Sequence, residues 1–284
     1  MQQANQSLRE ALTGIYEERE AKNITAMVME KLTGWTPVDR SINKTSTLSD
    51  NQESLLKGFQ AQLIQAKPVQ YVLNECWFFG MSLYVDEHVL IPRPETEELA
   101  DLAISYLKKK NRLLSVLDIG TGSGCIPLAI KKTLPHLQVH AMDVSEKAIE
   151  IAARNAASQK LEIQFHKVDF LDEDSWHQLP ETDLITSNPP YIPRKDMLTM
   201  HENVLRYEPH LALFVDNEDP LIFYRKIVGF AHQKLKPGGA VFLEIHESYG
   251  SEVSDLFNTG FSLAEIKKDM QGKERIIFAE KQIT

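Results

Sequence analysis

Hydrophobic residues recur at helical spacing through the first seventy residues of the chain. Three runs show it: Leu8-Leu12-Ile15-Tyr16, Ile24-Met27-Val28-Leu32 and Leu55-Leu56-Phe59-Leu63. Asp50 with Glu53 predicts a capping-box start for the third run, and Pro68 ends it. We therefore expect a small N-terminal helical domain of four or five helices over residues 1–75. It contains no Gly-rich loop or Cys pair, so its expected role is to dock a partner or act as a lid.

A short aromatic stretch follows the helical pattern. Gln70–Leu73 and Trp77–Val85 are rich in β-prone residues and predict a hairpin, which makes residues 76–93 a β linker between two domains. Pro94 suits the first turn of a helix. That helix carries an apolar stripe at helical spacing, formed by Leu99, Leu102, Ala103, Tyr106 and Leu107.

Beyond this point the pattern alternates between strand and helix. Apolar runs predict strands at 113–119, 137–142, 163–168, 183–187 and 240–244, with helices at 126–133 and 146–157. The last two apolar runs, 261–266 and 275–280, predict an antiparallel hairpin at the C-terminal end. Alternating βα units indicate an α/β domain over residues 94–284, with a doubly wound, mainly parallel sheet covered on both faces.

Charge and composition narrow the class of protein. The 284 residues carry a net charge of −9, and the parts before and after Leu90 are both acidic. Non-specific binding to nucleic acid needs clustered Lys and Arg, so we expect no direct nucleic-acid partner. The longest uncharged run, 119–130, is too short to span a bilayer, and no signal core is present; we expect a cytoplasmic protein without membrane contact.

Cysteine and histidine spacing predicts neither a disulfide framework nor a metal site. Cys76 and Cys125 stand far apart in the chain and fit a reducing compartment. His136 and His140 are four residues apart, but the apolar run that follows them indicates a strand, where the two rings would not share a face.

The first candidate site is the segment Asp118-Ile119-Gly120-Thr121-Gly122-Ser123-Gly124, between a predicted strand and a predicted helix. Glycines there allow a tight turn close to a ligand, beside the free N–H groups of a helix N-terminus. Asp143 ends the next strand, where an acidic residue typically accepts hydrogen bonds from a ribose. The G-x-G-x-G spacing and the carboxylate of Asp118 disfavour a pyrophosphate. They favour S-adenosylmethionine (SAM), which has an amino group and no phosphate.

The second candidate site is Asn188-Pro189-Pro190-Tyr191, directly after the predicted strand 183–187. The prolines fix the backbone and remove two N–H donors, which leaves the carbonyl of Pro189 as an acceptor. Asn188 adds a side-chain carbonyl and Tyr191 an aromatic face. Two acceptors beside a ring suit a planar NH2 group, and the carboxyl end of a strand is where such sheets bind ligands.

The chain resembles the HemK/PrmC family of protein-(glutamine-N5) methyltransferases, which modify peptide chain release factors. The resemblance covers nearly the whole chain. Besides the two sites above, it rests on Pro68-Val69-Gln70-Tyr71, Leu90-Ile91-Pro92-Arg93-Pro94-Glu95-Thr96-Glu97, Tyr207-Glu208-Pro209, Leu235-Lys236-Pro237-Gly238-Gly239 and Leu243-Glu244-Ile245. One departure is His246, where the family commonly has Gly, which predicts an altered local loop.

The resemblance implies a Rossmann-like, SAM-dependent methyltransferase fold and a role for each matching residue. Gly120, Thr121, Gly122, Ser123 and Gly124 would hold the methionine and ribose parts of SAM, Asp143 the ribose and Phe170 the adenine. Asn188, Pro189, Pro190 and Tyr191 would hold the glutamine amide, with Asn188 also near the cofactor. Arg93 and Thr96 would border the methionine end. The substrate would be the glutamine of the Gly-Gly-Gln motif in bacterial class-1 release factors, docked by residues 1–75 of a monomer.

Three alternatives remain open at this stage. An N6-adenine methyltransferase acting on DNA or RNA could use the same Asn-Pro-Pro-Tyr loop, with Tyr191 stacked on a flipped base. A non-catalytic SAM-binding partner of a translation factor would not need that loop. A nicotinamide dehydrogenase is disfavoured by the glycine spacing.

Overall fold

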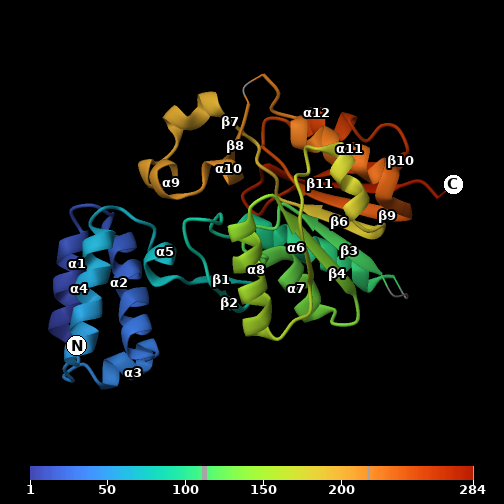
Figure 1. The fold of residues 1–284 in the computed structure, drawn as a ribbon. Coiled ribbons are helices and arrows are strands. Elements are labelled where there is room, and N and C mark those ends of the chain that lie inside the picture. The colour runs from blue at the N-terminus through green and yellow to red at the C-terminus, as the bar shows by residue number, and fades with distance from the viewer. Residues whose placement is uncertain (111–113, 217, 284) are drawn as a thin grey trace. The chain divides into compact units, whose positions relative to one another are not determined.

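The computed structural model describes residues 1–110, 114–216 and 218–283, and Leu113 of the predicted strand 113–119 lies outside them. The chain divides into two compact units (Figure 1). The first unit contains Met1–Glu75 together with the short segment His201–Tyr207, and the second contains Cys76–Met200 and Glu208–Thr284. Within the described ranges, no helix is long and apolar enough to cross a membrane.

The first unit is helical. Its helices are α1 (Gln2–Leu12), α2 (Glu18–Thr33), α3 (Pro37–Ile42), α4 (Asp50–Leu63), α5 (Val69–Leu73) and α9 (Glu202–Tyr207). The apolar stripes predicted from spacing form its core, which includes Leu8, Leu12, Ile24, Val28 and Leu63. The capping box of α4 lies one residue earlier than predicted: Ser49 is the N-cap and pairs with Gln52. A hydroxyl in extended backbone satisfies the free N–H groups of the first turn.

The prediction of a strand over Gln70–Leu73 is wrong, because this stretch forms α5. Val69, Val72 and Leu73 face the core of the first unit at helical spacing, so packing overrides the β-propensity of the individual residues. The hairpin consists instead of β1 (Cys76–Phe78) and β2 (Met81–Leu83), which pair antiparallel and belong to the second unit.

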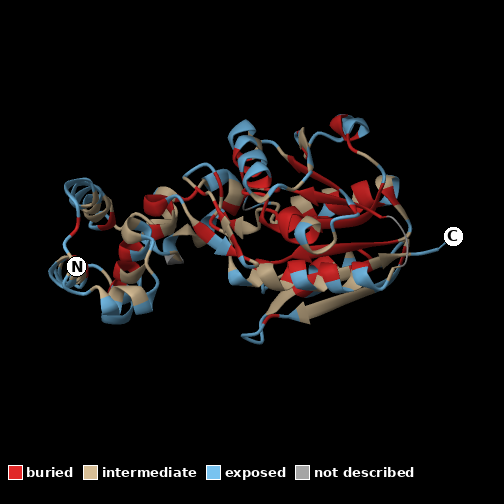
Figure 2. Cartoon of the chain, turned by 90° about the horizontal axis from the view of Figure 1, so that it is seen from below, coloured by how far each residue is buried: buried red, intermediate tan, exposed pale blue. Residues whose placement is uncertain are grey.

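The second unit is built on a seven-stranded sheet with the order β10-β11-β9-β6-β3-β4-β5. The strands are β3 (Ser115–Ile119), β4 (Gln138–Asp143), β5 (Gln164–Lys167), β6 (Thr182–Ser187), β9 (Leu235–Glu244), β10 (Phe261–Lys268) and β11 (Glu274–Lys281). β5, β4, β3, β6 and β9 run parallel, and β10 and β11 form the predicted C-terminal antiparallel hairpin. The central strands β3 and β6 are buried along their whole length (Figure 2).

Helices cover both faces of this sheet, as the alternating pattern predicted (Figure 1). One face packs against α6 (Pro94–Lys108), α7 (Cys125–Thr133) and α8 (Glu146–Gln159), and the other against α11 (Ile222–Lys234), α12 (Gly250–Asp255) and the 3-10 helix Glu173–Gln178. Successive residues of a strand face opposite layers: Val116 belongs to the first core and Leu117 to the second. The sequence did not predict α11 or the segment after β6. That segment contains β7 (Ile192–Pro193), a 3-10 turn, α9, α10 (His210–Leu213) and β8 (Phe214–Val215).

Candidate active site

The two candidate sites directly follow two adjacent parallel strands that end opposite each other. β3 pairs with β6, and its last residue, Ile119, lies opposite Ser187, the last residue of β6. The glycine loop starts directly after Ile119 and Asn188 directly follows Ser187. The strand order also reverses between β3 and β6, which is where open α/β sheets bind their ligands.

The glycine loop needs its glycines for two different reasons. Gly120, Gly122 and Gly124 all have positive φ, at 71°, 52° and 80°, a region that strains other residues. A Cβ on Gly124 would also lie 3.1 Å from the Cβ of Ala152 in α8, so this position lets α7 and α8 approach closely. Gly120 and Gly122 face open space, which leaves their backbone accessible to a ligand.

Three polar side-chain atoms in and beside this loop are buried and make no hydrogen bond of good geometry within the described residues: Asp118 Oδ2, Thr121 Oγ1 and Ser123 Oγ. The other carboxylate oxygen of Asp118 accepts a hydrogen bond from Thr186 Oγ1 at 2.7 Å. Burial raises the pKa of Asp118 to about 7, against the opposing effects of the Thr186 and Thr121 hydroxyl groups. Buried polar groups are normally paired, so unpaired ones beside a glycine loop indicate a place for a polar ligand.

Asp143 ends β4 beside the same loop. Its carboxylate accepts hydrogen bonds from the backbone N–H groups of Gly122 and Ser145, both at 2.9 Å. Burial raises the pKa of Asp143, while these N–H groups act in the opposite direction. The carboxylate therefore holds the shape of the loop, and its remaining lone pairs can accept hydrogen bonds from a ligand.

Phe170 follows β5 and is buried, with 4% of its surface exposed. Its ring stacks on Trp176 and meets Phe230 edge-on, both at a centroid distance of 5.5 Å. Trp176 Nε1 donates a hydrogen bond to the Phe170 carbonyl oxygen at 2.9 Å, which fixes this end of the strand. Phe170 thus presents an immobilised aromatic wall.

Asn188 is held by a residue from a different part of the chain. Its Nδ2 donates a hydrogen bond to Thr96 Oγ1 in α6 at 3.1 Å. Thr96 is buried and in turn donates from Oγ1 to Glu244 Oε2, at the end of β9, at 2.7 Å. With its NH2 group engaged, Asn188 has its side-chain carbonyl left as an acceptor.

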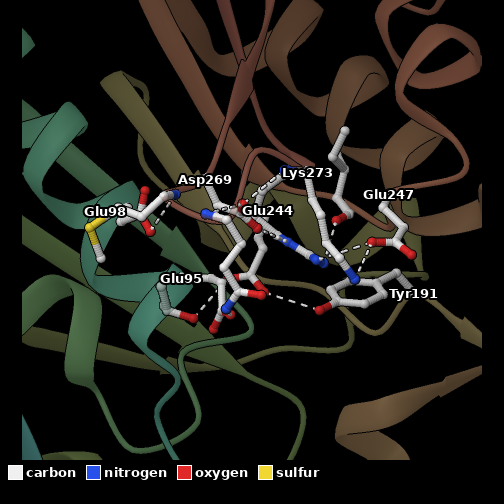
Figure 3. Close-up of polar contacts among 12 residues, drawn as sticks. Glu95, Glu98, Tyr191, Glu244, Glu247, Asp269 and Lys273 are labelled. Carbon is white, nitrogen blue, oxygen red and sulfur yellow. Dashed lines mark hydrogen bonds and ion pairs between the residues drawn. The ribbon is translucent and has the colours of Figure 1, made fainter.

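Tyr191 is half-buried, and its hydroxyl contacts the end of β9. Its hydroxyl donates a hydrogen bond to Glu244 Oε1 at 3.0 Å (Figure 3), and burial together with Glu244 raises its pKa. His246 packs edge-on against the Tyr191 ring at 6.0 Å. His246 does not have the positive φ that would require glycine, so the departure at this position replaces conformational freedom with an aromatic contact.

One cavity of about 440 Å³ gathers most of the predicted residues. It is lined by Gly120, Thr121, Gly122 and Ser123 of the glycine loop but not by Gly124, and by Asp143, Phe170, Asn188, Pro189, Pro190, Arg93 and Thr96. Tyr191 is not among the residues that line it, and the predicted contact of its ring with a substrate amide stays a prediction.

Sequence reasoning missed part of the cavity wall. The cavity is also lined by residues 87–90, Pro92, Pro209, Leu211 and Ala212. Glu208, next to Pro209, does not line the cavity but connects these two segments by hydrogen bonds. The buried carboxylate of Glu208 accepts hydrogen bonds from the backbone N–H of Ile91 at 3.3 Å and from Arg93 Nη2 at 2.5 Å. The Tyr-Glu-Pro motif was visible in the sequence, but nothing in its spacing pointed to Arg93.

The fold and this site define a SAM-dependent methyltransferase. Residues 97–210 match the family model of the Methyltransferase small domain. The catalytic domain of hMettl16, solved in complex with MAT2A 3′UTR hairpin 6, aligns with a TM-score of 0.53 and 15% identity over 83% of each chain. A methyltransferase from Pyrococcus furiosus aligns with a TM-score of 0.50 and 21% identity, over 79% of this chain and 98% of that one. At these identities the likeness concerns the fold alone.

Sequence relatives show to which family of methyltransferases the chain belongs. The chain is 40% identical over 271 residues to the release factor glutamine methyltransferase of Flavobacterium psychrophilum, with 94% of each chain covered. It is 36% identical over 275 residues to the protein of the same name from Bacteroides thetaiotaomicron, covering 96% of this chain and 98% of that one. The protein belongs to the release factor glutamine methyltransferase family.

Proposed function

We propose that this protein transfers a methyl group from SAM to the side-chain amide nitrogen of the glutamine in the Gly-Gly-Gln motif of a peptide chain release factor. One observation carries the proposal: the Asn-Pro-Pro loop and the glycine loop line the same cavity, in a chain that belongs to this family. A cofactor loop alone would serve many reactions, whereas the acceptors of the second loop select a planar NH2 group.

The residues around the glycine loop fit SAM. Asp118 Oδ2, Thr121 Oγ1 and Ser123 Oγ are buried polar atoms without a hydrogen bond of good geometry among the described residues, and an ammonium or carboxylate group could satisfy them. Thr121 and Ser123 line the cavity, and Asp118 precedes them in the sequence at the end of β3. Asp143 would hold the ribose hydroxyls and Phe170 the adenine. SAM, when bound, supplies a methyl group on a positively charged sulfonium with a neutral leaving group.

The chain's own contribution is to position the glutamine amide. Its nitrogen is a poor nucleophile because its lone pair is delocalised into the carbonyl group. Asn188 Oδ1 and the Pro189 carbonyl oxygen would accept hydrogen bonds from the two N–H groups and stabilise the positive charge that develops on the nitrogen as the N–C bond forms. One of these two protons then leaves to solvent, which gives the neutral N-methyl amide. Holding reacting groups in line can contribute about 7–11 kcal/mol to the lowering of the barrier.

A protein substrate agrees with the electrostatics of the chain. Its net charge of −9 disfavours a chain that gathers phosphates, because such binding needs an excess of clustered Lys and Arg. We assign docking of the release factor to the helical unit. Arg93, held by Glu208 and lining the cavity, would border the methionine end of the cofactor.

The test is a methylation assay with labelled SAM and three substrates: a release factor, nucleic acid, and a release factor whose Gly-Gly-Gln glutamine is replaced by alanine. We expect label only on the intact release factor, and mass mapping should place it on the glutamine side chain. Label on nucleic acid, or on the glutamine-free factor at the same rate, would overturn the proposal.

A further inference from the structure

A chain of hydrogen bonds leads from Asn188 away from the cavity to a buried carboxylate. Asn188 Nδ2 donates to Thr96 Oγ1, and Thr96 Oγ1 donates to Glu244 Oε2. Glu244 and Thr96 are each 2% exposed; Asn188 and Thr96 line the cavity, and Glu244 does not. The three residues come from α6, from the end of β6 and from the end of β9.

The direction of these hydrogen bonds follows from the chemistry of the groups. An ionised carboxylate only accepts, so the hydroxyl proton of Thr96 is committed to Glu244. The oxygen of Thr96 can then only accept from Asn188, which forces Asn188 to turn its NH2 group toward Thr96. Its carbonyl oxygen is thereby left for other partners. Without the carboxylate, Thr96 could donate to Asn188 Oδ1, and the amide would turn over.

We infer that Glu244 is a positioning residue that fixes the amide orientation of Asn188 through Thr96. The inference rests on the proposed function, in which Asn188 must offer an acceptor to the substrate NH2 group. A reversed Asn188 would present a donor to a donor, which repels the substrate amide. Glu244 acts without touching the substrate.

Hydrogen bonds from two hydroxyl groups hold the carboxylate of Glu244 in one place, and burial leaves its pKa raised above the ordinary value. β6 and β9 are parallel neighbours and Ser187 lies opposite Leu243, so Asn188 and Glu244 follow directly at the same level. The second carboxylate oxygen accepts from the Tyr191 hydroxyl, which ties the other end of the Asn-Pro-Pro-Tyr loop to the same group (Figure 3). Burial raises the pKa of Glu244, the bonds from Thr96 and Tyr191 and the charge of Arg275 lower it, and Glu95 raises it.

The first test removes the carboxylate without changing the length of the side chain. Glu244→Met leaves the Thr96 proton without its acceptor, and we expect kcat/KM for a release factor to fall about 100-fold while the Kd for SAM stays within threefold. Glu95→Gln removes a nearby negative charge outside the hydrogen-bond chain and serves as the matched control. Thr96→Val should reproduce the loss and Thr96→Ser should retain activity. Tyr191→Phe removes only the hydrogen bond from Tyr191 to Glu244, and it measures how much of kcat/KM depends on that bond.

A double-mutant cycle separates orientation from general damage to the fold. In the wild-type chain, Asn188→Asp places a carboxylate oxygen next to the Thr96 oxygen, which has no proton left to donate. This substitution should lower kcat/KM at least about 100-fold. In the Glu244→Met background the Thr96 hydroxyl can donate to Asp at position 188, whose second oxygen then serves as the acceptor. There the same substitution should change kcat/KM less than fivefold. Additive losses would overturn the inference.

An NMR measurement decides the question independently of activity. In the wild-type protein, one side-chain amide proton of Asn188 should exchange slowly with solvent, because Thr96 accepts it. Glu244→Met should remove that protection and Thr96→Ser should keep it. If the wild type methylates a release factor but Glu244→Met changes neither protection nor kcat/KM, the inference fails and the proposed function stands. If the wild type is inactive, the proposed function fails, and the exchange data still decide the orientation.

Discussion

Ser187 donates a hydrogen bond from its hydroxyl to the carbonyl oxygen of Ile119 at 2.7 Å, where β6 and β3 end side by side. The residue after each of them begins a loop that lines the cavity, the glycine loop on one strand and the Asn-Pro-Pro loop on the other. This strand pairing places the start of both loops at the same edge of the sheet, where a methyl donor and the amide that accepts the methyl group can lie next to each other.

Removing the acceptor on Asn188 should slow methylation without emptying the cofactor site. For Asn188→Ala we expect a fall in kcat of about 100- to 1,000-fold, as for loss of one oriented group in an oxyanion hole. Isothermal titration should show a Kd for SAM within about tenfold of the wild type. Wild-type rates with this variant would contradict the role we assign to Asn188.

Removing the carboxylate of Asp143 should, in contrast to Asn188→Ala, mainly weaken SAM binding. Asp143→Ala deletes the acceptor for the N–H groups of Gly122 and Ser145 and for the ribose, so affinity for SAM should fall about 10- to 100-fold. Asp143→Asn, which keeps one acceptor oxygen, should lie between. Isothermal titration with SAM is the measurement, and an unchanged Kd for the alanine variant would remove Asp143 from the site.

Substitutions of three glycines separate strain from ligand contact. Gly124→Ala combines positive φ with a 3.1 Å approach to Ala152, so it should lower the free energy of unfolding by about 1–3 kcal/mol. Gly122→Ala has the strain but open space, so it should cost less stability and should weaken SAM binding. Gly58→Ala, at an exposed position of α4 with nothing near its Cβ, should stabilise by about 0.5–1 kcal/mol. Urea denaturation measures all three; equal losses for Gly122 and Gly124 would contradict the packing argument.

The pH dependence of stability should contain a contribution from Asp118. Its pKa is raised by burial to about 7, above its ordinary value of 3.8, so between these values the folded state binds more protons than the unfolded state. The contribution is therefore favourable at low pH and is lost as pH rises toward and through 7, with a slope of at most about 1.4 kcal/mol per pH unit.

Asp118→Asn isolates this contribution from the other titrating groups. The difference in unfolding free energy between the wild type and this variant should change between pH 5 and pH 8, in favour of the variant as the pH rises. Denaturant titrations at four pH values within that range suffice. A difference that is constant with pH would show that Asp118 is already ionised at pH 5.

The helical unit should be needed for the substrate and not for the cofactor. A variant without residues 1–75 should lose release factor methylation while it retains SAM binding, because all residues that line the cavity belong to the second unit. SAM titration serves as the control for folding of the remaining chain. Loss of both activities, or of neither, would count against a docking role.

Local pattern in the sequence determined most of the architecture. Continuous apolar runs predicted the strands that carry the site, because both faces of a central strand are buried. Apolar spacing of 3.6 residues predicted the helices, because it places one face of a helix against the core. The glycine loop and the Asn-Pro-Pro segment could also be read locally, since positive φ and missing N–H donors are properties of the residues themselves. Gln70–Leu73 was misassigned, because packing against the helical core overrode β-propensity, and the capping box of α4 was predicted one residue too late. α11 and the segment after β6 were not predicted.

Only the tertiary structure decided which distant residues act together. Thr96, Asn188 and Glu244 are joined by hydrogen bonds because β6 and β9 are neighbours and α6 packs over them, and no spacing along the chain encodes that pairing. The same holds for Glu208 and Arg93. Side-chain orientation at Asn188 depends on which group accepts the proton of a residue 92 positions away, and such a contact exists only once the chain has folded.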